Sequence, residues 1–173
     1  MSKVILTTDR LLMRQLTLAD AAFVLELLNT PTYLKFIGDK NVRSIEDAKS
    51  HLKKDRIGSY KANGFGLWLV VLKESNKPIG TCGLIKRDAF ADVDIGFAFL
   101  PKFLGKGYGY EAARATLTFA YEELKMDRVI AFVNQDNKAS IALLEKLGLT
   151  FEKQVEISEG DVVQLFSPIK KPD

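Results

Sequence analysis

A group of closely spaced glycines gives the clearest chemical signal in the sequence. Gly105, Gly107 and Gly109 follow an apolar segment and precede a stretch whose apolar residues recur with the period of a helix. Glycine has no Cβ, so its main-chain N–H can approach an anion closely, and the first turn of a helix leaves N–H donors free at its positive end. A glycine loop that leads into a helix therefore predicts an anion site, and phosphate is the expected anion.

Two widespread phosphate-binding patterns fit this loop poorly. The P-loop, G-x-x-x-x-G-K-[ST], requires a hydroxyl residue after its lysine, but Lys106 is followed by Gly107. The dinucleotide fingerprint, G-x-G-x-x-G, fits Gly105 and Gly107 but finds Tyr110 at its third glycine. Its acidic ribose partner is matched only loosely, by Asp127.

A third pattern fits better. Residues 104–109, L-G-K-G-Y-G, resemble the [QR]-x-x-G-x-[GA] loop of the GNAT superfamily of acetyl-CoA-dependent N-acetyltransferases, except that Leu104 replaces Gln or Arg. The opening T-T-D-R-L-L-M-R-Q-L-T-L-A-D and the later N-K-A-S-I-A-L-L-E-K-L-G-L are similar to the branch that contains the ribosomal-protein N-terminal acetyltransferases. The resemblance runs from Thr7 to about Phe166, and the ordered set of three motifs is more specific than any one of them.

The resemblance implies an α/β fold, in which one domain over residues 1–173 holds a mixed, centrally splayed sheet of six or seven strands and about four helices. The core is expected at about 7–166, with 167–173 as a frayed tail. Acetyl-CoA is the implied cosubstrate, and no metal is expected. Its pyrophosphate is expected at the loop and its pantetheine arm between two splayed strands. The implied cofactor-binding residues are Phe97, Ala98, Phe99, Leu104, Gly105, Lys106, Gly107, Tyr108, Gly109, Tyr110 and Asn137.

The catalytic acid and base are less well defined. Many relatives use a tyrosine seven residues after the asparagine to protonate the departing thiolate, but Leu144 stands there. The serine of N-x-x-S, here Ser140, is the alternative donor, unless it serves only as a residue of the first helical turn. Phe132 replaces the glutamate that some relatives use as a base. Asp94 then becomes the best candidate base, acting directly or through water, unless it is only a solvated strand residue.

Three other side chains have chemistry that could serve catalysis or ligand binding, but each has a simpler structural interpretation. His51 is the only histidine and is interpreted as a residue of the surface or pocket wall, although its titration near neutral pH leaves a catalytic role open. Cys82 is the only cysteine and is expected to be a small buried residue, because a nucleophilic thiol needs an activating base. Trp68 is expected in the core.

Strands and helices that could position these residues follow from periodicity and from glycine and proline signals. Strands are predicted at Leu11–Leu16, Phe65–Leu72, Pro78–Lys86, Ala91–Leu100, Arg128–Val133, Leu149–Ile157 and Val162–Phe166, and helices at Leu18–Leu28, Ile45–Tyr60, from the glycine loop to about Lys125, and from Asp136 or Asn137 to Lys146. Pro31 is expected to end the first helix, and Thr32–Arg43 is expected to be a loop that sets acceptor specificity.

Composition excludes several classes of function. Formal net charge is +3, with 25 basic and 22 acidic residues interspersed, so no basic stripe for nucleic acid is expected. No apolar run approaches the ~18 residues of a membrane helix, and no secretory signal opens the chain. A single cysteine permits no intrachain disulfide, so a cytoplasmic protein is expected.

The expected function is direct transfer of an acetyl group from acetyl-CoA to a primary amine, at a protein N-terminus or on a small molecule such as a polyamine, an amino sugar or an antibiotic. The resemblance also allows a homodimer. The alternative is a non-catalytic acyl-CoA-binding or regulatory module. Leu144 and Phe132 favour the alternative, whereas Asp94, Asn137 and Ser140 favour the enzyme.

Overall fold

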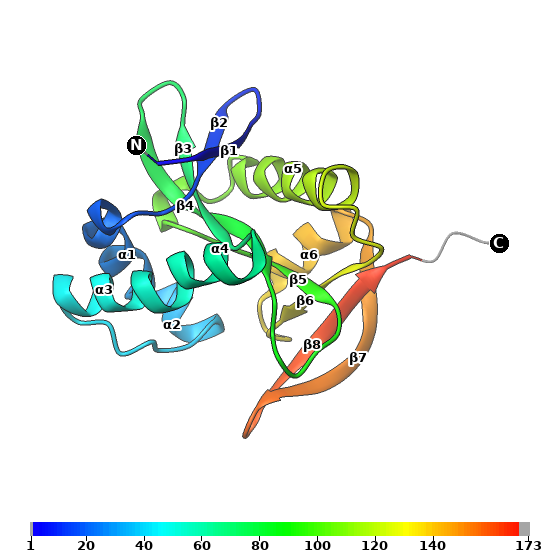
Figure 1. Ribbon diagram of the computed structural model, residues 1–173. Coiled ribbons are helices and arrows are strands. Elements are labelled where there is room, and N and C mark those ends of the chain that lie inside the picture. The colour runs from blue at the N-terminus through cyan, green and yellow to red at the C-terminus, as the bar shows by residue number, and fades with distance from the viewer. Residues whose placement is uncertain (1, 170–173) are drawn as a thin grey trace.

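An eight-stranded mixed sheet forms the centre of the protein in the computed structural model, which describes residues 2–169 (Figure 1). The strands lie in the order β1-β2-β3-β4-β5-β6-β8-β7, and all neighbours are antiparallel except β5 and β6. Their bounds are Val4–Thr7, Leu11–Arg14, Leu67–Leu72, Lys77–Ile85, Val93–Phe99, Val129–Val133, Leu149–Ser158 and Asp161–Pro168, from β1 to β8. The predicted α/β class is confirmed.

The sheet has eight strands rather than the predicted six or seven. The additional strand is β1, which pairs with β2 at the edge of the sheet. Half of its four residues are exposed, so it lacks the apolar pattern that marks a strand in a sequence. At the other end of the chain β8 continues to Pro168, past the expected end of the core at Phe166, and the rest of the predicted tail, 170–173, lies outside the described residues.

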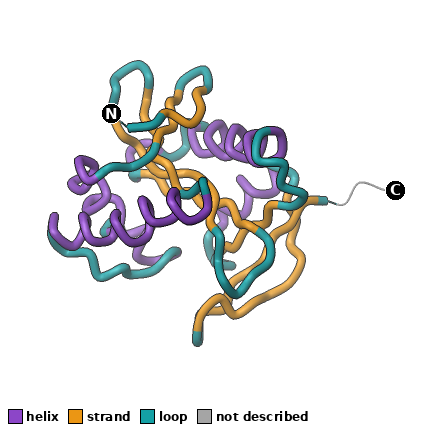
Figure 2. The backbone as a smooth tube through the Cα atoms, viewed as in Figure 1, coloured by secondary structure: helices purple, strands orange, loops and turns teal. Residues whose placement is uncertain are grey.

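Helices lie on both sides of this sheet (Figure 2). A 3₁₀ turn, η1, leads into α1, and a continuous helical segment from 45 to 63 joins α3, the π-helical turn η2 and α4. The bounds are Leu18–Asp20 (η1), Ala21–Leu28 (α1), Pro31–Phe36 (α2), Ile45–His51 (α3), Leu52–Ile57 (η2), Gly58–Asn63 (α4), Pro101–Phe103 (the 3₁₀ turn η3), Tyr108–Glu122 (α5) and Lys138–Lys146 (α6). Within residues 2–169, no helix has both the length and the apolar character needed to cross a bilayer.

The prediction of a loop at Thr32–Arg43 is wrong for its first part, where α2 lies. The Thr30 hydroxyl accepts a hydrogen bond from the N–H of Tyr33 at 3.4 Å and so caps this helix. Pro31 occupies the first helical position, where its missing N–H costs nothing and its fixed φ suits a helix. The proline therefore begins a second helix as well as ending the first.

Strand β3 separates two hydrophobic cores. Trp68 and Val70 pack on one side with α5, and the Trp68 ring meets Phe119 edge to face at 5.6 Å between centroids. Leu69 and Val71 point the other way and pack with α1 and α3. Successive side chains of a strand alternate between its faces, so a continuous apolar run indicates burial on both. The predicted core position of Trp68 is confirmed.

The parallel pair β5 and β6 separates almost at once. The two strands pair at Val93–Val129 and at Asp94–Ile130, and β5 then continues to Phe99 while its pairing with β6 stops. On its other edge β5 remains paired with β4 along its length, from Asp94 to Phe99. The predicted splay is therefore confirmed, and it begins at Asp94.

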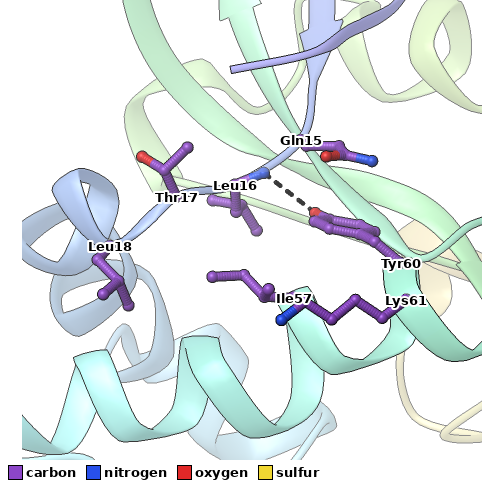
Figure 3. A pocket seen from close by; sticks show the side chains of 7 residues that line it. All are labelled: Gln15, Leu16, Thr17, Leu18, Ile57, Tyr60 and Lys61. Carbon is purple, nitrogen blue, oxygen red and sulfur yellow. Dashed lines mark hydrogen bonds between the residues drawn. The ribbon is translucent and has the colours of Figure 1, made fainter. Parts of the chain in front are cut away.

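Tyr60 fastens the helical segment 45–63 to the sheet. Its hydroxyl donates a hydrogen bond to the main-chain oxygen of Leu67 on β3 and accepts one from the N–H of Leu16 at 3.1 Å. Figure 3 shows the bond between Leu16 and Tyr60 beside an open hollow of about 500 Å³, which residues 15–18 line together with Ile57, Tyr60 and Lys61. Burial raises the pKa of Tyr60 to about 12, so the phenol stays protonated and can donate.

We expect Tyr60→Phe to lower the free energy of unfolding by about 1–3 kcal/mol, because the buried amide of Leu16 loses its partner. Urea unfolding followed by circular dichroism measures this. Tyr121→Phe is the matched comparison: the Tyr121 hydroxyl accepts a single, longer bond of 3.3 Å from the N–H of Val129, so this change should cost less. Equal urea midpoints for Tyr60→Phe and the wild type would show that the hydrogen bonds of the Tyr60 hydroxyl contribute nothing to stability.

Candidate active site

A cleft of about 850 Å³ lies where β5 and β6 separate. Residues of α2, of the helical segment 45–63, of β5 and β6 and of the start of α6 line it. Five of the predicted site residues come together there, namely Asp94, Phe97, Ala98, Asn137 and Ser140. Phe99 does not line the cleft, because its side chain is buried in the core on the α5 side of the sheet.

The glycine loop lies outside the lining of this cleft and forms the N-terminus of α5. Gly107 is the residue before the helix and has φ of 83°, and Gly105 has φ of 74°; both values favour glycine. The main-chain N–H of Glu111 donates to the Gly107 oxygen at 3.1 Å, so the N–H groups ahead of Glu111 precede the first bond of the helix. These amides, together with the helix dipole, fit an anion such as a pyrophosphate. Leu104 is 50% exposed at the edge of the loop.

The loop is held by contacts to the N-terminal hairpin that the sequence analysis missed. The Glu111 carboxylate accepts hydrogen bonds from Thr8 Oγ1 at 2.6 Å, from the N–H of Arg10 at 2.9 Å and from Arg10 Nε at 2.7 Å. Although burial opposes it, these bonds hold the pKa of Glu111 below its usual value. Arg10 Nη1 also donates to the Lys106 oxygen at 3.0 Å, and its guanidinium lies 4.4 Å from the centre of the Tyr108 ring.

Asp94 is buried at the point where the strands part. It is 2% exposed, so the alternative interpretation as a solvated strand residue is wrong. Arg87 donates from Nε to Oδ1 at 3.0 Å and from Nη2 to Oδ2 at 3.3 Å. Burial raises the pKa of Asp94 to about 6, and the Arg87 charge and hydrogen bonds limit that rise. Asp94 is therefore largely ionised at neutral pH and able to accept a proton. Arg87, which the sequence gave no reason to select, is its partner.

Asn137 and Ser140 face the cleft from the first turn of α6. Asn137 is the N-cap, and its Oδ1 accepts a hydrogen bond from the N–H of Ser140 at 3.2 Å. Within residues 2–169, the Ser140 hydroxyl itself takes part in no hydrogen bond to the protein. Leu144 lies one turn further along α6 and also lines the cleft. Residues four apart share a helix face, so Ser140 lies on the same face of α6 as Leu144, the position at which the resemblance implies a tyrosine.

The surroundings of Cys82 make it unsuited to act as a nucleophile. Those of His51 make it unsuited to act as an acid or base at neutral pH. Cys82 is buried in the core, as predicted, and burial raises the pKa of its thiol to about 12. His51 lines the cleft with a side chain that is 8% exposed, which makes it a wall residue. Its Nδ1 lies 3.0 Å from Asp55 Oδ2, and burial lowers its pKa to about 4, so the imidazole is neutral at physiological pH.

Comparison with known proteins is consistent with this geometry. The sequence profile of the family described as "Acetyltransferase (GNAT) domain" matches residues 10–150. The uncharacterized N-acetyltransferase YnaD of Bacillus subtilis (strain 168) is 30% identical over 147 residues, covering 85% of this chain and 83% of YnaD. A GNAT-family acetyltransferase from Bacillus anthracis is 26% identical and superposes with a TM-score of 0.75, covering 96% of each chain. The ribosomal L7/L12 α-N-protein acetyltransferase RimL, at 18% identity, shares the fold with a TM-score of 0.81 over 98% of this chain and 96% of RimL.

Titration of Asp94 followed by NMR of its side-chain carboxyl carbon is expected to give a pKa of about 6. Arg87→Gln should raise this pKa further, because the removed charge and hydrogen bonds favour the ionised carboxylate. Arg128→Gln is the matched control, since Arg128 pairs instead with Asp92 at 3.1 Å and Glu152 at 2.7 Å. An Asp94 pKa near that of an exposed carboxyl, or one that Arg87→Gln lowers, contradicts this account.

Proposed function

The chain belongs to the GNAT acetyltransferase family, and from that premise we propose that it moves an acetyl group from acetyl-CoA directly to a primary amine held in the cleft. One observation carries the proposal. The parting of β5 from β6 starts at Asp94, a buried carboxylate, and the opening is bordered by Ser140 on α6. A proton acceptor and a hydroxyl donor thus line the same opening in the sheet.

The glycine loop fits the pyrophosphate of acetyl-CoA. A Cβ added at Gly105 would meet no heavy atom within 4 Å, so the space beside the loop is open. The amides from Gly105 to Tyr110 would hold the phosphates with the dipole of α5. Lys106 adds a positive charge there, and its main-chain oxygen is fixed by Arg10. Leu104 offers no hydrogen bond in place of the family's Gln or Arg, so the main-chain amides carry the binding.

The pantetheine arm would lie along β5, where the strand has lost its partner. Phe97 and Ala98 line the opening, and the main-chain groups of β5 on that edge need hydrogen-bond partners. The amides of the arm would supply them in the manner of an added strand. Asn137 stands on the opposite border with its Oδ1 already used as the helix cap, which leaves its Nδ2 as the group available to the arm.

Two protons must move for the reaction to balance. Bound acetyl-CoA supplies a thioester carbonyl, at which a C–N bond forms with the amine and the C–S bond breaks. Asp94 takes the proton that the amine nitrogen loses, directly or through water. Ser140 gives its proton to the departing sulfur and regains one from water. Cys82, protonated and buried, forms no acyl intermediate, so the transfer is direct.

We expect the purified protein to release CoA thiol from acetyl-CoA when a suitable primary amine is added, and mass spectrometry should show the acetylated amine. Gly107→Val should abolish CoA binding in a calorimetric titration, because φ of 83° is strained for valine and a Cβ there lies 3.3 Å from Arg10 Nη2, in the group of contacts that holds the loop. Gly148→Val is the control for backbone strain alone: φ there is 90° and a Cβ meets nothing within 4 Å, so the same kind of strain is introduced away from the loop.

Three results would contradict parts of the proposal. Unchanged CoA affinity in a folded Gly107→Val protein removes the pyrophosphate assignment. Loss of affinity in Gly148→Val as well shows that strain, not the loop, is responsible. CoA binding without thiol release for any amine indicates the non-catalytic module instead.

Variants of the two proposed catalytic groups should differ in kind. Ser140→Ala should lower kcat by on the order of tenfold or more with little change in acetyl-CoA affinity, because the hydrogen bond from the serine hydroxyl to sulfur strengthens only in the transition state.

Asp94→Asn should remove the part of the pH profile of kcat/KM that rises near pH 6, where Asp94 becomes ionised. The profile must be repeated with an acceptor of different amine pKa. A limb that follows the acceptor and persists in Asp94→Asn shows that substrate deprotonation causes it and that Asp94 is not the base.

A further inference from the structure

The cleft carries more positive than negative charge. Five cationic side chains and three acidic ones line it, namely Lys40, Lys54, Arg56, Lys86 and Arg87 against Asp55, Asp94 and Asp161. His51 adds no charge at neutral pH, because burial lowers its pKa to about 4. A concave surface of one prevailing sign concentrates ligands of the opposite sign.

Two of these cations are already engaged, and the other three form no ion pair within residues 2–169. Arg87 is paired with Asp94, and the Lys86 ammonium donates to the main-chain oxygens of Arg87 at 2.9 Å and Phe90 at 2.5 Å. Within the described part of the chain, none of Lys40, Lys54 and Arg56 is paired with a carboxylate, and the Arg56 guanidinium lies beside the Tyr33 hydroxyl. Lys40 and Arg56 therefore keep their capacity to bind an anion.

Lys40 and Arg56 also lie close enough to affect one another. Burial lowers the pKa of Lys40, and the charges of Arg56 and Arg87 lower it further, while Asp55 and Asp161 only partly offset them. Cations held together in a partly buried site repel one another, and a bound anion relieves that repulsion. Arg56 comes from the π-helical turn η2, a departure from α-helix that is frequent at functional sites.

These cations are not required by the cofactor. The loop proposed for the pyrophosphate lies outside the lining of the cleft, whereas Lys40 and Arg56 come from the opposite wall, on the segment after α2 and on η2. Tyr33, Phe36 and Ile37 line the same wall and provide apolar surface beside them. This wall belongs to the acceptor.

Resting on the function proposed above, we propose that the acceptor is an amine that also bears a carboxylate, which Arg56 binds with Lys40 beside it. The planar guanidinium of arginine matches a carboxylate in two parallel hydrogen bonds. Asp55 and Asp161 nearby favour a singly charged group over a phosphate dianion. Polyamines and amino sugars with several ammonium groups are poor acceptors on this account, since each added cation enters a positively charged cleft.

The test uses amines in pairs that differ only in the carboxylate. Amino acids and dipeptides are each compared with their carboxamides, and spermidine represents the polycations; kcat/KM is followed by CoA thiol release. We expect the best acceptors to carry a carboxylate and to exceed their carboxamides by on the order of tenfold. Arg56→Gln should remove most of this preference through KM and leave the carboxamides within about twofold. Lys53→Gln, on the same helical turn but outside the lining of the cleft, should retain it.

Amino acids outperforming dipeptides would show that the carboxylate lies next to the amine, and the reverse would place it further away. Carboxamides or spermidine equal to or better than the carboxylates overturns the inference while leaving the acetyltransferase function intact. If no amine releases thiol, the same pairs are titrated calorimetrically into the CoA-saturated protein. Tighter binding of carboxylates that Arg56→Gln abolishes then supports the anion site by itself, and equal or absent binding of both members overturns it.

Discussion

The separation of β5 from β6 is the constraint on which the site depends. A strand inside a sheet normally satisfies its main-chain groups on both edges, yet β5 loses one neighbour after Asp94. Such an edge is costly in a closed core and useful beside a ligand that has amide groups of its own. The same opening provides the proposed channel for the pantetheine arm, and Asp94 and Ser140 are among the residues that line it.

An opening of this kind persists only if both of its sides are held. On one side β5 stays paired with β4 along its length. The next strand, β3, has a hydrophobic core packed against each of its two faces. Glu111 ties the start of α5, and with it the glycine loop, to Arg10 on the N-terminal hairpin. Tyr60 ties the helical segment 45–63 to Leu16 and Leu67. The glycine loop and the helical segment 45–63 are thus attached separately to the sheet.

Much of this arrangement was predictable because it rests on local or periodic signals. The buried run at β3, the glycine loop before α5 and the cap at Asn137 are each readable from a few adjacent residues. The pairings of Arg87 with Asp94 and of Arg10 with Glu111 could not be predicted, because the spacing of these residues in the sequence carries no signal. Arg10 and Glu111, for example, are 101 positions apart. Helix α2 does not follow from the sequence prediction because proline commonly ends a helix, although it also suits a first helical position, which Pro31 occupies here.

The positive cleft and the buried carboxylate of Asp94 would favour the same proton transfer in the proposed reaction. An amine acceptor arrives mostly as an ammonium ion and must lose a proton before its nitrogen can attack. Nearby cations disfavour the charged form of an amine, so Lys40 and Arg56 would lower the pKa of the bound acceptor while holding its carboxylate. Asp94, with its pKa raised by burial to about 6, is a stronger base than an exposed aspartate and still largely ionised at neutral pH. Arg87 keeps it ionised. The difference in pKa between the bound amine and the Asp94 carboxylate would therefore be smaller than the difference in water, which makes the proton transfer less unfavourable.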